Sequence, residues 1–355
     1  MKILAVETSC DESAISLMEI KSQGRAGFSK KRKNLKIPQF KILENLVASQ
    51  IKVHQPFGGV VPNLAKREHL KNLPILLEKI KENKIKNIDL IAVTVGPGLE
   101  PALWTGVNFA QQLAKKLKKP LLGVSHLDGH LYSFLLSAKN QRLKSKDLFP
   151  AIGLIISGGH TILVKVDSLV KYKKLGETVD DAVGEAFDKV ARILGLSYPG
   201  GPEIEKLAKK GNPDSILFPR PMLNQKNYNF SYSGLKTSVL YYLRDHQNEQ
   251  KSDIAASFQK AAFDVLIKKT LRAAEEFKAK SIMISGGVAA NKTLAQEFKK
   301  AINEKFKAHN LRTKKPQLLI TKFPTDNAAM IAIAAYINHI RKKKYKLEAN
   351  GNLDI

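Results

Sequence analysis

The sequence predicts an α/β protein made of two duplicated lobes. Short apolar runs typical of buried strands alternate with amphipathic stretches typical of helices along all 355 residues. The order hairpin, helix, strand with glycine turn, helix, strand, helix occurs twice, offset by roughly 150–200 residues. A chain of this length also exceeds a typical single domain. Two lobes of matching order are expected to enclose a cleft, where ligands would bind beyond the carboxyl ends of the strands.

Apolar runs bounded by glycine, proline or polar turns place the elements of the first half. Strands are expected at 2–6, 14–18, 42–53, 89–95 and 121–124, and helices at 63–81, 102–118 and from 127 or 128 to 138. His69 and Arg67 lie on the first of these helices and are expected to be exposed.

The second half repeats this order of strands and helices. Strands are expected at 151–156, 161–166, 280–285 and 317–321, and helices at 181–196, 203–210, 252–278, 291–306 and 327–340. Most of 211–250 shows no clear period, and the stretch 230–236 is interpreted as a loop.

His126 and His130 follow the last strand of the first half. At spacing i, i+4 on a helix, both imidazoles share one face and can chelate one divalent metal ion. Alternatively, one histidine is structural and the other exposed. A third ligand is expected to be a carboxylate, and Asp326 follows the equivalent strand of the second half. Asp326 could instead cap the final helix, unless Thr325 does so.

Glycine-rich turns and an acidic turn follow other strands. In 157–160 and 285–291, Gly-Gly pairs would let backbone N–H groups approach a phosphate. Neither stretch matches a P-loop or a dinucleotide fingerprint, so together they indicate nucleotide binding of another kind. The hairpin turn 7–13 is rich in hydroxyls and carboxylates, and either binds a phosphate or its counter-cation or is a solvated turn.

The composition favours a polyanionic partner. The formal charge is +27 and the pI near 9.9, although only 10 of the 59 basic residues are Arg, so the Lys excess can also reflect codon bias. The single cysteine, Cys10, excludes an intrachain disulfide and fits a reducing cytosol. No apolar run is long enough for a bilayer, and the start does not resemble a signal peptide, which predicts a cytoplasmic protein without a membrane partner.

Ten stretches along the chain resemble one family. They are Glu7–Glu12, Phe57–Pro62, Val95–Leu99, His126–His130, Ser157–Thr161, Asp180–Lys189, Tyr198–Pro202, Phe230–Thr237, Ser285–Asn291 and Thr325–Met330. Together they resemble the tRNA N6-adenosine threonylcarbamoyltransferase family (TsaD-type), formerly called O-sialoglycoprotein endopeptidase. The resemblance implies the actin/Hsp70/sugar-kinase fold, with two ribonuclease H-like lobes around an interdomain cleft. We expect the first lobe at 1–130 with 327–355 and the second at 131–326.

The resemblance implies transfer of a threonylcarbamoyl group from threonylcarbamoyl-AMP to N6 of adenosine 37 in tRNAs that read ANN codons, with release of AMP. Its implied metal ligands are His126, His130 and Asp326, and the ion would be iron ahead of zinc. Implied adenylate contacts are Ile155, Ile156, Ser157, Gly158, Gly159, Asp188, Gly201 and Asn291. Asp11 and Glu12 are catalytic candidates that would orient the acceptor amine or a water molecule.

The resemblance also implies partners, and this sequence departs from the family pattern in some places. The family generally works with a smaller paralogous subunit and a small ATPase in a heteromeric complex. Here Asn63 stands where the family usually has Glu, and the basic insertions at 21–36 and 139–147 are longer than usual. Lys30–Lys33 and Lys342–Lys344 are the candidate tRNA-binding runs.

Three other functions compete with the transferase. The first is a metal-dependent endopeptidase, but Leu127 follows His126 where the zincin motif H-E-x-x-H has its glutamate. The second is a non-catalytic scaffold paralogue of the same fold, which should lack the metal triad and the glycine turns. The third, a sugar kinase, lacks a convincing base for the phosphoacceptor.

Overall fold

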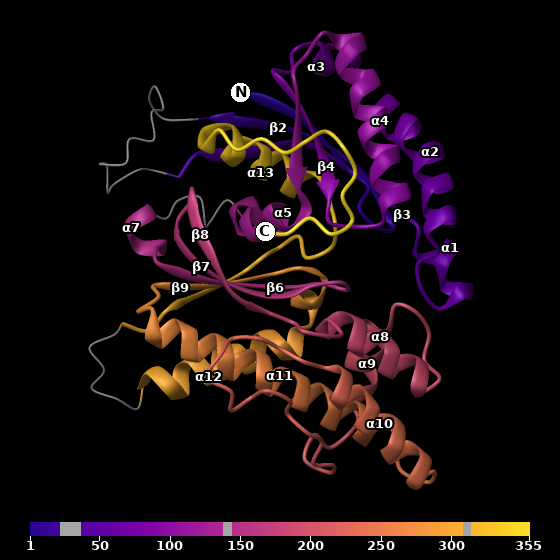
Figure 1. The fold of residues 1–355 in the computed structure, drawn as a ribbon, viewed down its shortest axis with the longest axis vertical. Coiled ribbons are helices and arrows are strands. Elements are labelled where there is room, and N and C mark those ends of the chain that lie inside the picture. Colours follow the sequence, from indigo (N-terminus) through magenta and orange to yellow (C-terminus); the bar gives the residue numbers. More distant parts are fainter. Residues whose placement is uncertain (22–36, 138–143, 308–313) are drawn as a thin grey trace. The chain divides into compact units, whose positions relative to one another are not determined.

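A computed structural model of the chain describes residues 1–21, 37–137, 144–307 and 314–355. These residues form two compact units (Figure 1). Unit 1 comprises Met1–Asp147 and Thr321–Ile355, and unit 2 comprises Leu148–Ile320. Each unit is a five-stranded mixed sheet with helices, which confirms the predicted α/β class.

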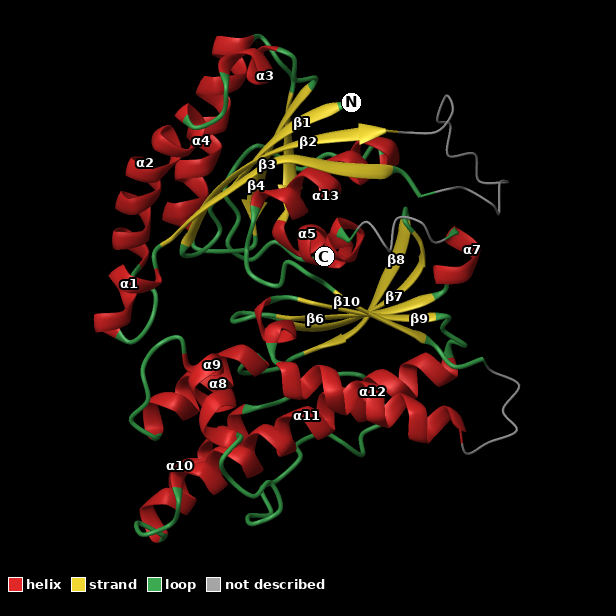
Figure 2. Ribbon diagram, turned by 180° about the vertical axis from the view of Figure 1, so that it is seen from behind, coloured by secondary structure: helices red, strands yellow, loops and turns green. Residues whose placement is uncertain are grey.

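Unit 1 has helices on both faces of its sheet (Figure 2). Its strands are β1 (Lys2–Glu7), β2 (Glu12–Lys21), β3 (Gln39–Ser49), β4 (Leu90–Gly96) and β5 (Leu121–Ser125). Its helices are α1 (Ile51–His54), η1 (Gln55–Phe57), α2 (Pro62–Glu78), α3 (Glu82–Lys86), α4 (Glu100–Leu117), α5 (His126–Tyr132), η2 (Ser133–Leu136) and α13 (Ala328–Arg341), with α7 (Ser145–Leu148) at the boundary between the units. Helices α2 and α4 pack side by side, and α13 packs against β1, β2 and α5.

Unit 2 repeats this plan. Its strands are β6 (Ala151–Ile156), β7 (Thr161–Ser168), β8 (Lys171–Glu177), β9 (Ser281–Ser285) and β10 (Gln317–Ile320). Its helices are α8 (Val183–Ile193), α9 (Gly200–Ala208), α10 (Ser233–Asp245), α11 (Lys251–Glu276), η3 (Gly287–Ala290) and α12 (Lys292–Lys307).

The two sheets have the same topology. The strand order is β3-β2-β1-β4-β5 in unit 1 and β8-β7-β6-β9-β10 in unit 2, read in the same direction. In both sheets the first three strands form an antiparallel meander, and the last two continue in parallel from the central strand. The duplication predicted from the order of elements is therefore confirmed. The parallel strands end at one edge of each sheet, where loops can collect functional groups.

Three local predictions were wrong. The strand expected at 42–53 is β3 at Gln39–Ser49, and its last residues form the short helix α1. The edge strand β8 was missed because its sequence, KYKKLGE, is lysine-rich, which is typical of protected sheet edges rather than of buried strands. The stretch expected to be a loop at 230–236 begins α10 at Ser233, where the side chain and backbone donors of Ser233 bond Asp180.

Apolar side chains fill the space between each sheet and its helices. In unit 2 the rings of Phe187 and Phe258 meet edge to face at 4.9 Å between centroids, within the core that α8 and α11 form against the sheet. Among the helices of the described residues, none combines the length and apolarity needed to cross a bilayer.

Lys269 of α11 is a buried cation in unit 2. Only 1% of the residue is exposed, and its Nζ donates to the carbonyl oxygens of Asn229 (2.5 Å) and Asn227 (3.3 Å). Burial, with a smaller effect of Arg272, lowers the pKa of Lys269 to about 8. The folded protein therefore binds the Lys269 proton less tightly than the unfolded chain does.

This shift predicts a pH dependence of stability. Between pH 8 and pH 10.5 the unfolded state retains the proton that the native state has lost, so stability should rise with pH. Relative to Lys269→Met, the wild-type free energy of unfolding should increase by about 2–3 kcal/mol across this window. Denaturant titrations at several pH values measure the difference, and parallel curves for the two proteins would contradict it.

Candidate metal and nucleotide sites

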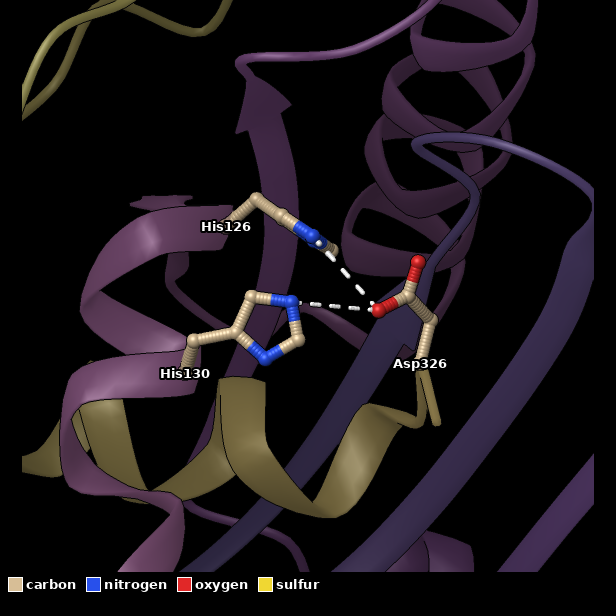
Figure 3. A group of neighbouring side chains, drawn as sticks. All are labelled: His126, His130 and Asp326. Carbon is tan, nitrogen blue, oxygen red and sulfur yellow. Dashed lines mark ion pairs between the residues drawn. The ribbon is translucent and has the colours of Figure 1, made fainter. Parts of the chain in front are cut away.

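Three predicted ligands converge in unit 1. His126 and His130 are the first and fifth residues of α5, and Asp326 precedes α13, which packs against α5. Figure 3 shows the two rings and the carboxylate facing a common point. The three residues offer ligand atoms that all lie within 4.8 Å of one another. Asp326 thus lies in the same compact unit as the histidines.

The donor spacing fits a small divalent ion. Asp326 Oδ1 lies 3.6 Å from His126 Nε2 and 3.3 Å from His130 Nε2. Two donors that each bind one ion at about 2.0–2.2 Å, at a tetrahedral angle, lie about 3.3–3.6 Å apart. The imidazole rings are 4.5 Å apart between centroids and nearly perpendicular, at 82°, so both can direct a nitrogen to one ion.

The negative charge around His126 favours a bound cation, either a proton or a metal ion that displaces it. Burial by itself lowers the pKa of His126, but the carboxylates of Asp326 and Glu7 raise it to about 9. Burial and the neighbouring His126 lower the pKa of His130. His130 is fully buried; its Nε2 lies 3.3 Å from Asp326 Oδ1, and its Nδ1 makes no hydrogen bond within the described residues. A buried imidazole with so few partners loses solvation, which coordination to a metal would restore.

Glu7, at the end of β1, orients His126. Its side chain is fully buried, and its Oε2 accepts from Thr94 Oγ1 (2.5 Å) and lies 3.3 Å from His126 Nδ1. Ser9 Oγ lies 3.1 Å from the same Nδ1, and Ser9 N donates to Glu7 Oε1 (2.6 Å), so Glu7 and Ser9 together face this nitrogen. Burial opposes ionisation of Glu7, but His126 lowers its pKa. A carboxylate at Nδ1 favours the tautomer that leaves Nε2 free to coordinate, as in carboxylate–histidine–metal arrangements. Glu7 was expected only as part of the polar turn 7–13 and not as a partner of His126, although an acidic residue that closes an apolar strand is a signal for such a role.

Replacing Glu7 with Gln is expected to weaken metal binding about 10–100-fold, because an amide donor at Nδ1 would favour the tautomer with a proton on Nε2. Competition with a chromophoric chelator, using Zn²⁺ or Fe²⁺, measures the affinity. Glu82→Gln is the matched control, because the Glu82 side chain is 80% exposed in α3. Equal affinities for Glu7→Gln and wild type would show that Glu7 does not orient His126.

Neighbouring residues of the triad have structural roles of their own. The cap of α13 is Asn327, whose Oδ1 accepts from Met330 N (3.1 Å), so the alternative that Asp326 or Thr325 caps this helix is wrong. Asp128 is fully buried, and its Oδ2 accepts from Tyr345 Oη (2.8 Å) and Asn338 Nδ2 (3.0 Å). Helix α5 begins at His126 itself, one or two residues earlier than expected.

Of the two catalytic candidates, Glu12 lies close enough to Asp326 for the charge of that carboxylate to affect its pKa. Asp11 is 7% exposed, and Glu12 begins β2. Burial, Asp326 and Asp11 together raise the pKa of Glu12 to about 10. Acidic side chains from the first hairpin and the segment before α13 are thus gathered at one place in unit 1.

In unit 2 the first glycine turn is open. Ser157 N donates to His160 O (2.8 Å), which closes the turn between β6 and β7. Gly158 and Gly159 are exposed, and a Cβ on either would meet nothing within 4 Å. By contrast, a Cβ on Gly184 at the start of α8 would lie 2.4 Å from Ser157 O. Helix α8 therefore packs directly against the turn and leaves its glycines accessible to a ligand.

The second glycine turn lies beside the first. Gly286 has φ +93°, and a Cβ there would lie 2.3 Å from Ile156 O, so β6 and the turn after β9 are in close contact. Gly287 and Gly201 face open space. The side chains of Ile155 and Ile156 are fully buried, which leaves only their backbone for a ligand.

Two polar candidates in unit 2, Asp188 and Asn291, already accept hydrogen bonds from backbone N–H groups. Asp188 Oδ1 accepts from Gly200 N (2.7 Å) at the start of α9. Asn291 Oδ1 accepts from Leu294 N (3.0 Å), and its Nδ2 donates to Gln259 Oε1 (2.9 Å). An amide offers four hydrogen-bonding positions, so Asn291 retains one donor and one acceptor position for a ligand. Alanine at either position would disturb the fold as well as a ligand.

His69 was also misjudged. It was expected to be exposed on its helix, but it is fully buried, and its Nε2 lies 3.0 Å from Cys10 O. The signal for burial was a helix pattern with apolar residues four positions away on either side, Ala65 and Leu73.

Comparison with known proteins gives consistent results. The family TsaD, described as tRNA N6-adenosine threonylcarbamoyltransferase, matches residues 41–333. A protein of that name from Thermosipho africanus is 48% identical over 370 aligned positions, which cover all of both chains. Another from Moorella thermoacetica is 43% identical and covers 99% of this chain and 96% of its own.

Solved structures with low identity share the fold. HypF of T. kodakarensis superposes with a TM-score of 0.59 at 15% identity over 96% of this chain, which corresponds to 47% of HypF. A ROK family protein from Streptococcus pneumoniae gives a TM-score of 0.50 at 12% identity, covering 97% of this chain and all of that protein. These likenesses support the actin/Hsp70/sugar-kinase fold class expected from the sequence.

Proposed function

The chain belongs to the tRNA N6-adenosine threonylcarbamoyltransferase family, and on that premise we propose that it modifies adenosine 37 of tRNAs that read ANN codons. The donor is threonylcarbamoyl-AMP. The N6 amine attacks the carbamoyl carbonyl carbon, the bond from that carbon to the phosphate oxygen breaks, AMP leaves, and the amine loses one proton. The full-length match to relatives of this name carries the proposal, and the retained His126, His130 and Asp326 cluster supports it.

The three clustered side chains would hold one divalent metal ion, iron ahead of zinc. Two imidazoles and one carboxylate are the ligand set of many non-haem Fe(II) sites, although zinc accepts the same donors. When bound, the ion supplies Lewis-acid stabilisation of charge that develops on the donor. Asp11 and Glu12, beside Asp326, would orient the acceptor amine or a water molecule.

The open turns of unit 2 would bind the adenylate. Backbone N–H groups of the stretch from Ile155 to Gly159 would approach the phosphate, because no side chain blocks Gly158 or Gly159. Asp188, Gly201 and Asn291 would complete the contacts, with Asp188 accepting from ribose hydroxyls. The groups already bonded by Asp188 and Asn291 would hold these side chains in fixed orientations.

The tRNA is the expected macromolecular substrate, and the charge of +27 supports it. Of the candidate basic runs, Lys30–Lys33 lie outside the described residues. Lys342 and Lys344 are exposed, whereas Lys343 lies over the ring of Tyr345 at 4.5 Å. We further propose a smaller paralogous subunit and a small ATPase as partners, and a cytoplasmic location, where the tRNA substrate is found.

The endopeptidase is the weaker candidate. A zincin places its general base next to the first histidine, and Leu127 at that position is 1% exposed and apolar. The nearest carboxylate along α5 is Asp128, which is already bonded by Tyr345 and Asn338. A scaffold paralogue is disfavoured by the intact ligand cluster.

Depletion of the protein in its host tests the proposal. Mass spectrometry of tRNA nucleosides should show loss of threonylcarbamoyladenosine and its return when the wild-type gene is supplied. Asp326→Asn should fail to restore it, whereas Asp167→Asn, a surface carboxylate on β7, should succeed. An unchanged nucleoside level after depletion would refute the function.

A further inference from the structure

A chain of buried polar side chains lies beside the acidic hairpin turn of unit 1. It consists of His54 on α1, Gln50 before it, His69 on α2 and Ser13 on β2. All four are at most 1% exposed. Neither the metal cluster nor the adenylate contacts include any of them, so their role has to be found in what they bond.

The hydrogen bonds of His69 have a definite direction. Its Nε2 lies 3.0 Å from Cys10 O, and a carbonyl only accepts, so Nε2 carries the proton. Its Nδ1 therefore accepts, from Ser13 Oγ at 2.8 Å or Gln50 Nε2 at 3.2 Å. Burial, the largest influence, lowers the pKa of His69 and keeps the ring neutral, as this pattern requires.

The direction continues through the other members. His54 Nδ1 accepts from Val61 N (3.3 Å), so its Nε2 carries the proton and donates to Gln50 Oε1 (3.0 Å). Gln50 Nε2 then donates toward Ser13 Oγ (3.3 Å) and His69. Every donor thus points from Val61, which precedes α2, toward Cys10. Hydrogen bonds aligned in one direction polarise and strengthen one another.

This series of hydrogen bonds reaches residues on both sides of Asp11 and Glu12. His69 bonds Cys10 on one side and Ser13 on the other, while Gln50 N donates to Asp11 O (2.9 Å). These hydrogen bonds to Cys10 O and Asp11 O fix the backbone that carries the Asp11 and Glu12 side chains.

We propose that His69 is a positioning residue that holds the turn carrying Asp11 and Glu12 beside Asp326, and that Gln50 and His54 link this turn to Val61 at the start of α2. The inference rests on the proposed function, because it assigns a catalytic consequence to the orientation of Asp11 and Glu12. Whether His69 holds this turn in place can be tested without measuring activity.

Hydrogen exchange of the full-length protein tests whether His69 holds the turn in place. In His69→Phe, which keeps a ring of similar shape without donor or acceptor, the amides of residues 8–13 should exchange at least about tenfold faster, whereas those of unit 2 should be unchanged. Exchange equal to wild type would overturn the proposal. Asn72→Ala, on the same helix, removes only a 3.4 Å contact to Ser13 Oγ and should leave residues 8–13 protected.

Two conservative variants test the catalytic consequence. Gln at position 69 can donate to Cys10 O from nearly the position of Nε2, whereas Asn cannot reach it. His69→Gln should therefore retain most of kcat, and His69→Asn should lose about 10–100-fold in kcat with little change in KM for tRNA or donor. This comparison also decides the case if the Phe variant does not fold.

The outcomes separate the two hypotheses. Equal kcat for the Gln and Asn variants of an active enzyme would overturn the positioning role. Wild-type protein that transfers nothing, when assayed with its partners, would refute the proposed function, while the exchange measurement would still decide whether His69 holds the turn.

Discussion

Replacement of His130 with alanine is expected to abolish both metal binding and threonylcarbamoyl transfer while the protein remains folded. His130 supplies one of three donors, and two ligands rarely retain an ion, so affinity should fall by at least about 100-fold. The fold should survive because the His130 ring contacts Asp326, another proposed ligand, at 3.3 Å and makes no hydrogen bond to the backbone within the described residues. His126→Ala should have the same effect on transfer.

The measurement combines metal analysis of the purified protein, chelator competition with Zn²⁺ and Fe²⁺, and a thermal melt. His246→Ala is the control, since His246 is exposed at the end of α10 in unit 2. A His130→Ala protein that binds the ion as tightly as wild type would mean that the metal, if any, is held elsewhere. Loss of transfer with full metal affinity would indicate a different role for the ring.

Replacement of Gly158 with valine is expected to reduce AMP affinity at least about tenfold without destabilising the protein. A Cβ at this position meets nothing within 4 Å, so the side chain would occupy the open space where a phosphate is expected to lie. Because that space is open, the substitution creates no clash in the ligand-free protein. This separates binding from folding more cleanly than Asp188→Ala or Asn291→Ala, whose side chains also bond the backbone.

Calorimetric titration with AMP gives the affinity, and a thermal melt verifies the fold. Gly234→Ala is the matched control, since a Cβ at Gly234 has only an ordinary contact with Pro221 at 3.9 Å. Gly184→Ala should show the opposite pattern, a loss of stability, because its Cβ would lie 2.4 Å from Ser157 O. Unchanged AMP affinity in Gly158→Val would move the adenylate site away from this turn.

Much of the local architecture could be predicted because it depends on short-range patterns. The buried strands β1, β4, β6 and β9 are apolar runs that end at polar or glycine turns, and these signals lie within a few residues of each element. The duplicated order of elements follows from the same signals. Helix α10 and strand β8 were missed because their sequences carry weak periodicity and their formation depends on partners elsewhere in unit 2.

Some features of the candidate sites also follow from the sequence, and others depend on the tertiary structure. The sequence alone determined the pairing of His126 with His130, because i, i+4 spacing on a helix sets it. It also placed glycines in the turn at Gly158–Gly159, but only the tertiary structure showed that this turn is open, since Gly184 and Gly286 are closely packed. The order of elements predicted Asp326 as the third ligand, and the tertiary structure brings it to both histidines. Only the tertiary structure decided that Glu7 faces His126 Nδ1 and that His69 bonds Cys10 O. Those contacts join residues 59 to 200 positions apart. Local propensity does not contain such pairings, because they form only when packing of the sheets and helices brings distant segments together.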